Sequence, residues 1–274
     1  MKIDLAFKYK DLINYLNKIV PFTPQVTIVL GSGLGDFAET LNIVKSISTT
    51  DLPGYPPSTV EGHSGRIIFA ESGNKKLLLF KGRIHFYEGY KIYECILPVF
   101  ISYKLGCNKI IFTNAAGGIK KDYSPGDLML AESFNGLNIK KELTDIIGIA
   151  SAEVKNNLGN FTSSQLNKII EQAAVEENID LKKGTYWFSK GPSYETPAEI
   201  NMMAKFRGDA VGMSTVHEII FALSLGMEAA SISCITNYAA GISTTKLSHE
   251  EVTETANRVK DTFGSLVNRV IALI

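Results

Sequence analysis

The chain has 274 residues, and 45% of them are hydrophobic, which is enough to bury one large core. Lys plus Arg and Asp plus Glu each number 28, so the formal net charge is zero. This balance argues against a nucleic-acid partner and against a polybasic membrane surface, and we expect a single domain over residues 1–274 that binds a small molecule.

The hydrophobic pattern alternates between helical and strand periods along the chain. It opens with an amphipathic helix from Leu5 to Ile19, which ends before Pro21. Strands are then predicted at Val26–Leu30, Arg66–Glu71, Leu77–Lys81, Lys109–Thr113, Asp127–Ala131, Gly184–Phe188, Ala210–Gly212 and Ala229–Ile235. The predicted helices cover 91–105, 163–177, 197–204, 215–225 and 249–272. This alternation predicts an α/β fold with a mixed or parallel sheet between helices, and only residues 132–160 give no clear pattern.

The cysteine usage and the N-terminus bear on location. Cys95, Cys107 and Cys234 lie in apolar segments, which indicates buried thiols in a reducing compartment. No apolar run approaches the roughly 20 residues that span a bilayer, and the N-terminus lacks the apolar core of a signal peptide. We therefore expect a cytoplasmic protein with no membrane partner.

Three predicted strands are each followed by polar residues that suit an anion. Gly31-Ser32-Gly33 follows the first strand, Gly82-Arg83-Ile84-His85 follows the third, and Asn114-Ala115-Ala116-Gly117-Gly118 follows the fourth. Open α/β sheets bind ligands where strand ends converge. The three motifs therefore predict one shared oxyanion pocket.

The glycine-rich motif at residues 31–35 is not a dinucleotide fingerprint, because position 36 is Asp36 and no P-loop lysine follows. Its backbone N–H groups and the Ser32 hydroxyl can seat a phosphate, although a tight turn without a ligand is equally compatible with the motif.

Arg83 and His85 flank Ile84, so their side chains should point to one side while the isoleucine packs on the other. Taken singly, a surface salt bridge and a core histidine explain these residues as well. Together with Ser32 and with His63 in a glycine-flanked loop, they favour a phosphate site.

Three later motifs could also take part in binding a ligand. Two prolines frame Tyr194 and Glu195 ahead of a helix whose N-cap would be Thr196, and Glu195 could instead be a capping acid. Asn237 follows a predicted strand and offers both a donor and an acceptor, although a turn residue is the alternative. Ser214 and Thr215 precede a helix and suit either anion binding or N-capping.

The combination of motifs resembles the trimeric class of purine nucleoside phosphorylases, in the superfamily that also contains methylthioadenosine phosphorylase. The matching segments are 29–35, 62–63, 82–89, 113–118, 191–197, 210–216, 236–237 and 248–252. The resemblance implies a single α/β domain with a central mixed β-sheet flanked by helices, the nucleoside phosphorylase fold, assembled as a homotrimer.

The resemblance also implies a role for each matching site residue. It assigns phosphate binding to Ser32, His63, Arg83, His85, the Ala115 backbone and Ser214, and ribose binding to Tyr87, Met213 and His249. It assigns base binding to Tyr194, Glu195, Val211 and Asn237. His85, Glu195 and Asn237 are the residues expected to take part in catalysis.

The implied reaction is the phosphorolysis of 6-oxopurine nucleosides such as inosine and guanosine to a free base and ribose 1-phosphate. Inorganic phosphate is the co-substrate, and neither a metal nor an organic cofactor is implied. Asn237 argues against methylthioadenosine phosphorylase, which usually carries aspartate there, and a non-catalytic nucleoside-binding or phosphate-binding protein is the rival from another class.

Two departures from the family pattern stand out. Glu132-Ser133-Phe134-Asn135 replaces the usual Asp-His-Ile-Asn, and the loop that follows, from which the family supplies a base-covering phenylalanine to a neighbouring subunit, has changed. Whether Phe161 replaces that phenylalanine stays open. His217 stands where proline is expected, and we expect it to face away from the substrate.

Overall fold

The structure is a computed structural model that describes residues 2–57, 65–148, 150–158, 162–243 and 249–274, and for residues 249–252 it describes the backbone only. Its strands are β1 (Val26–Leu30), β2 (Asn42–Ser48), β3 (Arg66–Ser72), β4 (Lys75–Lys81), β5 (Lys109–Gly118), β6 (Leu128–Asn135), β7 (Lys182–Phe188), β8 (Ala210–Gly212) and β9 (Glu228–Tyr238). Its α-helices are α1 (Leu5–Lys8), α2 (Lys10–Ile19), α3 (Ile92–Cys95), α4 (Leu97–Lys104), α5 (Lys140–Ile147), α6 (Ala152–Leu158), α7 (Ser164–Glu176), α8 (Pro197–Lys205), α9 (Val216–Ser224), α10 (His249–Arg258) and α11 (Lys260–Leu273).

The strands form one mixed sheet in the order β2-β3-β4-β1-β5-β8-β7-β6-β9. β1 runs parallel to both β4 and β5, whereas β3 pairs antiparallel with β2 and β4. β9 pairs with β6 and also with β5, so this end of the sheet closes on itself. The expected α/β class with a central mixed sheet is confirmed.

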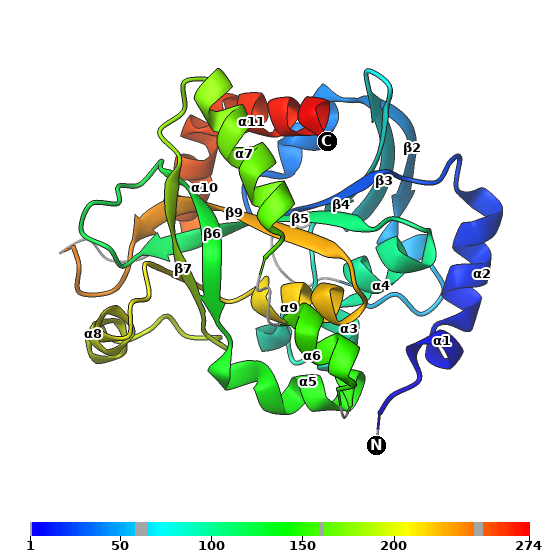
Figure 1. Cartoon of the computed structure of the whole chain (residues 1–274), viewed down its shortest axis with the longest axis horizontal. Coiled ribbons are helices and arrows are strands. Elements are labelled where there is room, and N and C mark those ends of the chain that lie inside the picture. Colours follow the sequence, from blue (N-terminus) through cyan, green and yellow to red (C-terminus); the bar gives the residue numbers. More distant parts are fainter. Residues whose placement is uncertain (1, 58–64, 149, 159–161, 244–248) are drawn as a thin grey trace.

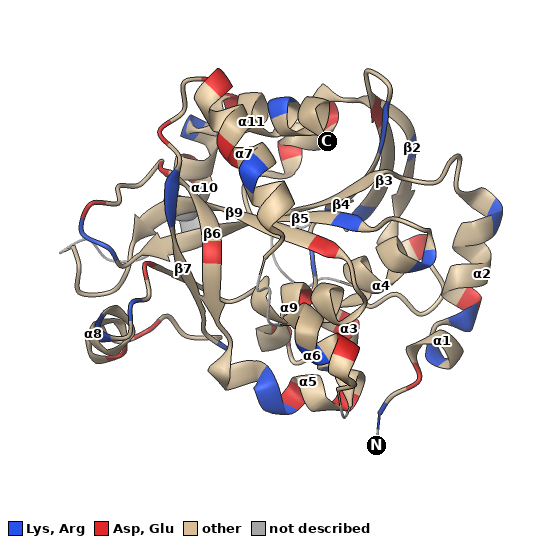
Figure 2. Cartoon of the chain, in the orientation of Figure 1, with Lys and Arg blue, Asp and Glu red and all other residues tan. Residues whose placement is uncertain are grey.

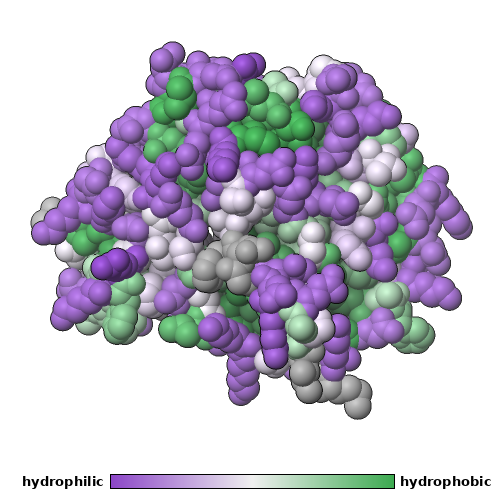
Figure 3. Space-filling view, viewed as in Figure 1, coloured by the Kyte–Doolittle hydropathy of each residue, from purple (hydrophilic) through white to green (hydrophobic). Residues whose placement is uncertain are grey.

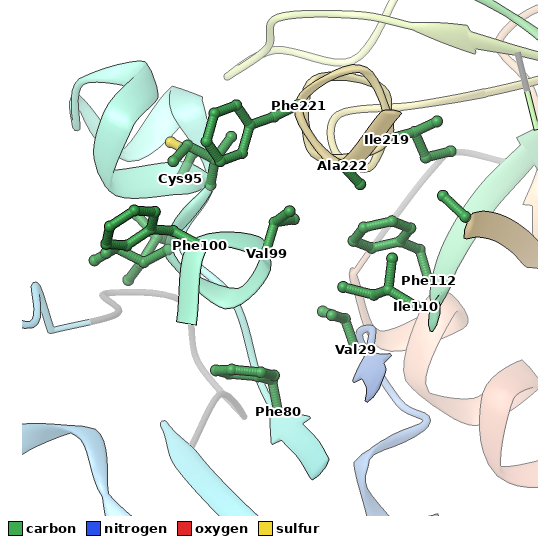
Figure 4. Packing of buried hydrophobic residues seen from close by; sticks show 14 of the residues in the cluster. Val29, Phe80, Cys95, Val99, Phe100, Ile110, Phe112, Ile219, Phe221 and Ala222 are labelled. Atoms are coloured by element: carbon green, nitrogen blue, oxygen red, sulfur yellow. The ribbon is translucent and has the colours of Figure 1, made fainter. Parts of the chain in front are cut away.

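Helices cover the sheet on both faces (Figure 1). Each face has its own apolar core. On one face, α7, α10 and α11 bury side chains such as Ile170 and Phe263 against the sheet. On the other face, α2, α4 and α9 do the same. Figure 4 shows Val29 and Phe112 from the strands on one side of this second core and Val99 and Phe221 from α4 and α9 on the other. The central strands β1 and β5 are therefore packed on both of their faces, whereas the edge strand β2 is largely exposed.

The predicted strands are all present, and β5 and β9 extend beyond their predicted ends. The strand β2 was missed. It is an edge strand with a bulge between Ile43 and Lys45, and a bulge breaks the alternation by which a strand is recognised. Three predicted helices, at 5–19, 91–105 and 249–272, are each divided in two by a single residue, at Tyr9, Ile96 and Val259.

Residues 132–160, which gave no pattern, contain the end of β6, a short 3₁₀ turn at Leu137–Ile139, and helices α5 and α6. These helices are short, and α6 buries none of its side chains, so its apolar periodicity is weak.

Lys and Arg lie interspersed with Asp and Glu over the helices and strands (Figure 2). The face seen in Figure 3 is mainly hydrophilic, with hydrophobic residues in separate small groups. Within the described ranges, no helix has both the length and the apolar character needed to cross a membrane. Cys95, Cys107 and Cys234 are buried free thiols, as expected.

Candidate active site

The C-terminal ends of β4, β1 and β5 meet at one edge of the sheet because these strands are parallel neighbours. A cavity of about 130 Å³ lies there. It is lined by Gly31, Ser32, Arg83, His85, Tyr87, Asn114, Ala115, Ala116, Gly117, Tyr194, Glu195, Val211, Gly212, Met213, Ser214, Thr236, Asn237 and Ala239. The predicted convergence of the three strand ends on one pocket is confirmed.

Most of the predicted site residues line this cavity, and only two do not appear in it. His63 lies outside the described residues. His249 is the first residue of α10, and its side chain is also outside the description. The structure therefore does not place these two histidine side chains, and for the other residues it shows a place in the cavity lining.

Gly31 follows β1 and lets the end of that strand approach β5 closely. A Cβ atom on Gly31 would lie 2.6 Å from the carbonyl oxygen of Thr113 and 2.7 Å from Cα of Asn114. The Thr113 hydroxyl accepts a hydrogen bond from the Gly31 N–H at 3.1 Å. A side chain at this position would push β1 away from β5, so glycine is required by close backbone approach. The segment that follows is a short 3₁₀ helix, Gly35–Thr40, and not an α-helix.

Arg83 is 2% exposed, and its ion pair is internal. Its Nη1 donates to Glu218 Oε2 at 3.1 Å and to Thr215 Oγ1 at 2.9 Å. Its Nη2 donates to the carbonyl oxygen of Thr113 at 2.6 Å. A surface salt bridge is thus excluded as the role of Arg83, and the guanidinium plane is held rigidly at the cavity wall. Ile84 packs into the core on the opposite side, as predicted.

His85 lines the cavity and is oriented by Glu88. The Glu88 carboxylate accepts from the backbone N–H of His85 at 2.6 Å and lies 3.3 Å from its Nδ1. The imidazole stacks on Tyr87, with ring centroids 4.8 Å apart. Burial lowers the pKa of His85, and the hydrogen bond that the Glu88 carboxylate accepts from its ring opposes this shift. With the proton on Nδ1 facing Glu88, His85 presents Nε2 on its other side.

Glu218 was not found from the sequence, although the spacing Thr215-x-x-Glu218 is that of a capping box. Its Oε2 accepts from the Thr215 N–H at 3.0 Å as well as from Arg83. Burial raises the pKa of the Glu218 carboxyl, and Arg83 and the Thr215 amide oppose that shift. Glu88 was missed too, and the signal for it is the spacing His85-x-x-Glu88.

Two of the residues predicted for the ribose, Tyr87 and Met213, lie together at one wall of the cavity. A Cβ atom on Gly191 would lie 2.7 Å from Sδ of Met213 and 3.2 Å from Cβ of Tyr87. The glycine thus allows the segment that carries Tyr194 and Glu195 to pass directly over Met213 and Tyr87.

Glu195 offers a buried acceptor to the cavity. Its Oε1 is buried and has no hydrogen-bond partner among the described residues. The capping acid of α8 is Glu199, which accepts from the Thr196 N–H at 2.7 Å, while the Thr196 side chain caps the helix as predicted. Glu195 therefore does not serve as a capping acid. Tyr194 lies beside it and is 45% exposed.

Asn237 is fixed by its neighbours along β9. Its Nδ2 donates to the carbonyl oxygen of Tyr238 at 2.9 Å, and its Oδ1 accepts from the Thr236 hydroxyl at 2.9 Å. The amide keeps one N–H and one lone pair for a ligand. Because β9 pairs with β5, Asn237 lies opposite Gly117. It belongs to the strand itself, so a turn role is excluded.

The divergent helix α5 is tied to the segment that carries Tyr194 and Glu195. Glu142 on α5 lies 2.6 Å from Nζ of Lys190, which also stands over the Phe86 ring at 5.8 Å from its centroid. Phe161, the suggested replacement for the family's base-covering phenylalanine, lies outside the described residues. The Glu142–Lys190 ion pair thus joins the altered region to the segment that carries Tyr194 and Glu195, within the same chain.

His217 lies behind the cavity and does not line it, in agreement with the expectation that it faces away from the substrate. It is 1% exposed, and its ring packs edge to face on Phe188, with centroids 5.5 Å apart. Among the described residues neither ring nitrogen has a hydrogen-bond partner. Burial lowers the pKa of His217 to about 3, so the ring is neutral at physiological pH.

Several cavity residues had no predicted role, among them Asn114 and Thr236, although both lie in motifs that the sequence singled out. Across the ranges that the structure describes, no three His, Cys, Asp or Glu side chains are grouped as they would be around a metal ion.

Comparison with known proteins relates this chain to one family. The model of the phosphorylase superfamily matches residues 25–272. The purine nucleoside phosphorylase 1 of Bacillus subtilis is 38% identical over 264 residues, which cover 94% of this chain and 95% of that protein. The corresponding protein of Geobacillus stearothermophilus is 37% identical, with 94% of each chain covered. A crystal structure of the Schistosoma mansoni purine nucleoside phosphorylase with inosine has a TM-score of 0.86 and 28% identity, and the match covers 99% of this chain and 97% of that one.

Proposed function

The chain belongs to the phosphorylase superfamily, among the purine nucleoside phosphorylases, and from this premise we propose that it cleaves 6-oxopurine nucleosides with inorganic phosphate. The products are the free base and ribose 1-phosphate, or the deoxyribose equivalent, and inosine and guanosine are the substrates. The observation that carries the proposal is the convergence of Ser32, Arg83, His85 and Ser214 on the cavity that also holds Glu195 and Asn237.

The phosphate side of the site works by charge and position. Cleavage of the N-glycosidic bond leaves positive charge on the ribose ring, and a phosphate anion beneath the anomeric carbon stabilises that charge before it captures the sugar. Ser32, Ser214 and the Ala115 backbone donate hydrogen bonds to the anion, and Arg83 supplies positive charge. His63 closes over it. No metal or organic cofactor has a step in this reaction.

The base side of the site stabilises the departing purine. The free N–H of Asn237 donates to the 6-oxo oxygen, and its remaining lone pair accepts from a protonated N7. The buried Oε1 of Glu195 accepts from the N1–H group, which gives this orphan acceptor a donor. Tyr194 stacks on the base, and Val211 lines its pocket. Tyr87, Met213 and His249 hold the ribose.

We further propose that residues 1–274 act as one domain in the cytoplasm and assemble as a homotrimer, with no nucleic-acid or membrane partner. The three buried free thiols support a reducing compartment. Light scattering at micromolar concentration tests the assembly, and a monomer mass would refute the trimer.

The test of the activity is the release of hypoxanthine from inosine with and without inorganic phosphate. We expect release to depend on phosphate and to yield ribose 1-phosphate. Equal release without phosphate would make the protein a hydrolase, and binding of inosine without release would make it a non-catalytic binding protein. Adenosine, tested in parallel, is expected to react far more slowly than inosine.

A further inference from the structure

Ser214 is presented to the cavity by an unusual backbone turn. Thr215 has φ 73° and ψ −49°, and the N–H of Val216 donates to the carbonyl oxygen of Ser214 at 2.8 Å, which together define a γ-turn. A β-branched residue adopts this conformation only where surrounding contacts hold it. Thr215 is 1% exposed and does not line the cavity itself.

The contacts that hold the turn converge on Thr215. Its backbone N–H donates to Glu218 Oε2 at 3.0 Å. Its Oγ1 accepts from Arg83 Nη1 at 2.9 Å and from Asn114 Nδ2 at 3.0 Å. Arg83 follows the end of β4 and Asn114 lies within β5, so the hydroxyl joins three separate segments of the site.

The hydrogen-bond count fixes the direction of the next bond. A hydroxyl oxygen has two lone pairs and one proton, and neither an arginine nor an amide NH₂ group can accept. With Arg83 and Asn114 filling both lone pairs, the Thr215 proton is left to donate to Ser214 Oγ, which lies 3.0 Å away. Ser214 Oγ therefore accepts from Thr215, and its own proton can turn to an acceptor in the cavity that Ser214 lines.

We propose that Thr215 is a positioning residue for phosphate: its hydroxyl couples Arg83 to Ser214 and turns the Ser214 O–H towards the anion. This inference rests on the proposed function of the cavity as a phosphate site. Thr215 does not touch phosphate, and it acts through the two residues that line the cavity.

The experiment replaces Thr215 with valine, which has the same shape and branching but no hydroxyl, and compares it with serine, which keeps the hydroxyl. Thr27→Val is the matched control, because Thr27 is fully buried and does not line the cavity. Its hydroxyl donates a hydrogen bond to Ser102 Oγ, at a distance of 3.0 Å. The KM for inorganic phosphate and the KM for inosine at saturating phosphate are measured for each protein.

We expect Thr215→Val to raise the KM for phosphate at least tenfold and to change the KM for inosine less than twofold. Thr215→Ser and Thr27→Val should keep the phosphate KM within about threefold of the parent protein. An unchanged phosphate KM in Thr215→Val, or an equal rise of both KM values, would overturn the inference.

Thr215→Gly covers the case in which the valine variant does not fold, because glycine accepts a positive φ and also lacks the hydroxyl. We expect it to lose phosphate affinity to the same extent, and a phosphate KM equal to that of the parent protein would overturn the inference. If the parent protein releases base equally well without phosphate, the proposed function fails instead, and the two failures are distinguishable.

Discussion

The Glu88 carboxylate binds His85 twice, at its backbone N–H over 2.6 Å and at its ring Nδ1 over 3.3 Å. A contact of this kind selects the tautomer of a histidine and the plane of its ring. The carboxylate lies three residues beyond the histidine, so a single turn of chain both places His85 at the cavity and decides which nitrogen it presents.

Glu88→Gln should weaken phosphate binding by removing the charge that orients His85. We expect the phosphate KM to rise about tenfold, since a hydrogen bond to a charged group contributes about 1.5–3 kcal/mol and the glutamine keeps part of it. Steady-state kinetics at saturating inosine measures the change. Glu94→Gln is the control, because Glu94 accepts the equivalent hydrogen bond from the Lys91 N–H, at a distance of 2.7 Å. Neither of these two residues lines the cavity. Equal effects of the two variants would contradict the role given to Glu88.

Asn237→Asp should lower kcat/KM for inosine relative to adenosine. An ionised aspartate cannot donate to a 6-oxo group, and it repels that oxygen, whereas the 6-amino group of adenine is a donor. A mismatched buried polar pair costs about 1–3 kcal/mol, so the inosine-to-adenosine ratio should fall by one to two decades.

The same substitution places a carboxylate oxygen against the carbonyl oxygen of Tyr238, where Nδ2 now donates at 2.9 Å. Thermal unfolding should therefore show a loss of stability as well. A folded variant with an unchanged inosine-to-adenosine ratio would show that Asn237 does not read the base.

His217→Leu should make the protein more resistant to acid. Burial lowers the pKa of His217 from 6.5 to about 3, so the folded state excludes a proton that the unfolded state binds below pH 6.5. The neutral ring costs no stability above pH 6.5, and the free energy of unfolding falls as the pH drops from 6.5 towards 3. At pH 5 this loss amounts to about 2 kcal/mol. Urea unfolding at pH 7.5 and pH 5 should show a smaller difference for the variant, by about that amount. An equal difference in both proteins would mean that His217 gains a proton freely in the folded state.

Gly31→Ala should destabilise the fold and impair the site together. The added methyl would lie 2.6 Å from the carbonyl oxygen of Thr113, and overpacking of this kind costs about 1–3 kcal/mol. Gly264→Ala in α11 is the control, because its nearest neighbour would be Phe37 Cδ2 at 4.0 Å. There we expect a gain of about 0.5–1 kcal/mol from helix propensity, measured by urea unfolding. A loss of similar size in both variants would refute the close-approach explanation.

Local pattern was sufficient to predict much of this protein. The apolar runs of β1, β4 and β5 and the polar motifs after them predicted one oxyanion pocket, because the ends of neighbouring parallel strands must meet. The Thr196 cap was equally local. Composition and spacing could not identify a purine, and that inference came from family resemblance.

Tertiary structure decided what depends on residues far apart in sequence. The pairing of β9 with β5 brings Asn237 opposite Gly117, and no local pattern of either strand encodes that partner. The buried Glu218 meets Arg83 only because α9 packs behind the strand ends, 135 residues further along the chain. Helix and strand periodicity is a property of short segments, so the sequence could predict the strands whose ends form the cavity. Which side chains meet across the core depends on the packing of all elements together. Only the fold therefore shows the hydrogen-bond network of Arg83, Thr215 and Glu218 behind the cavity.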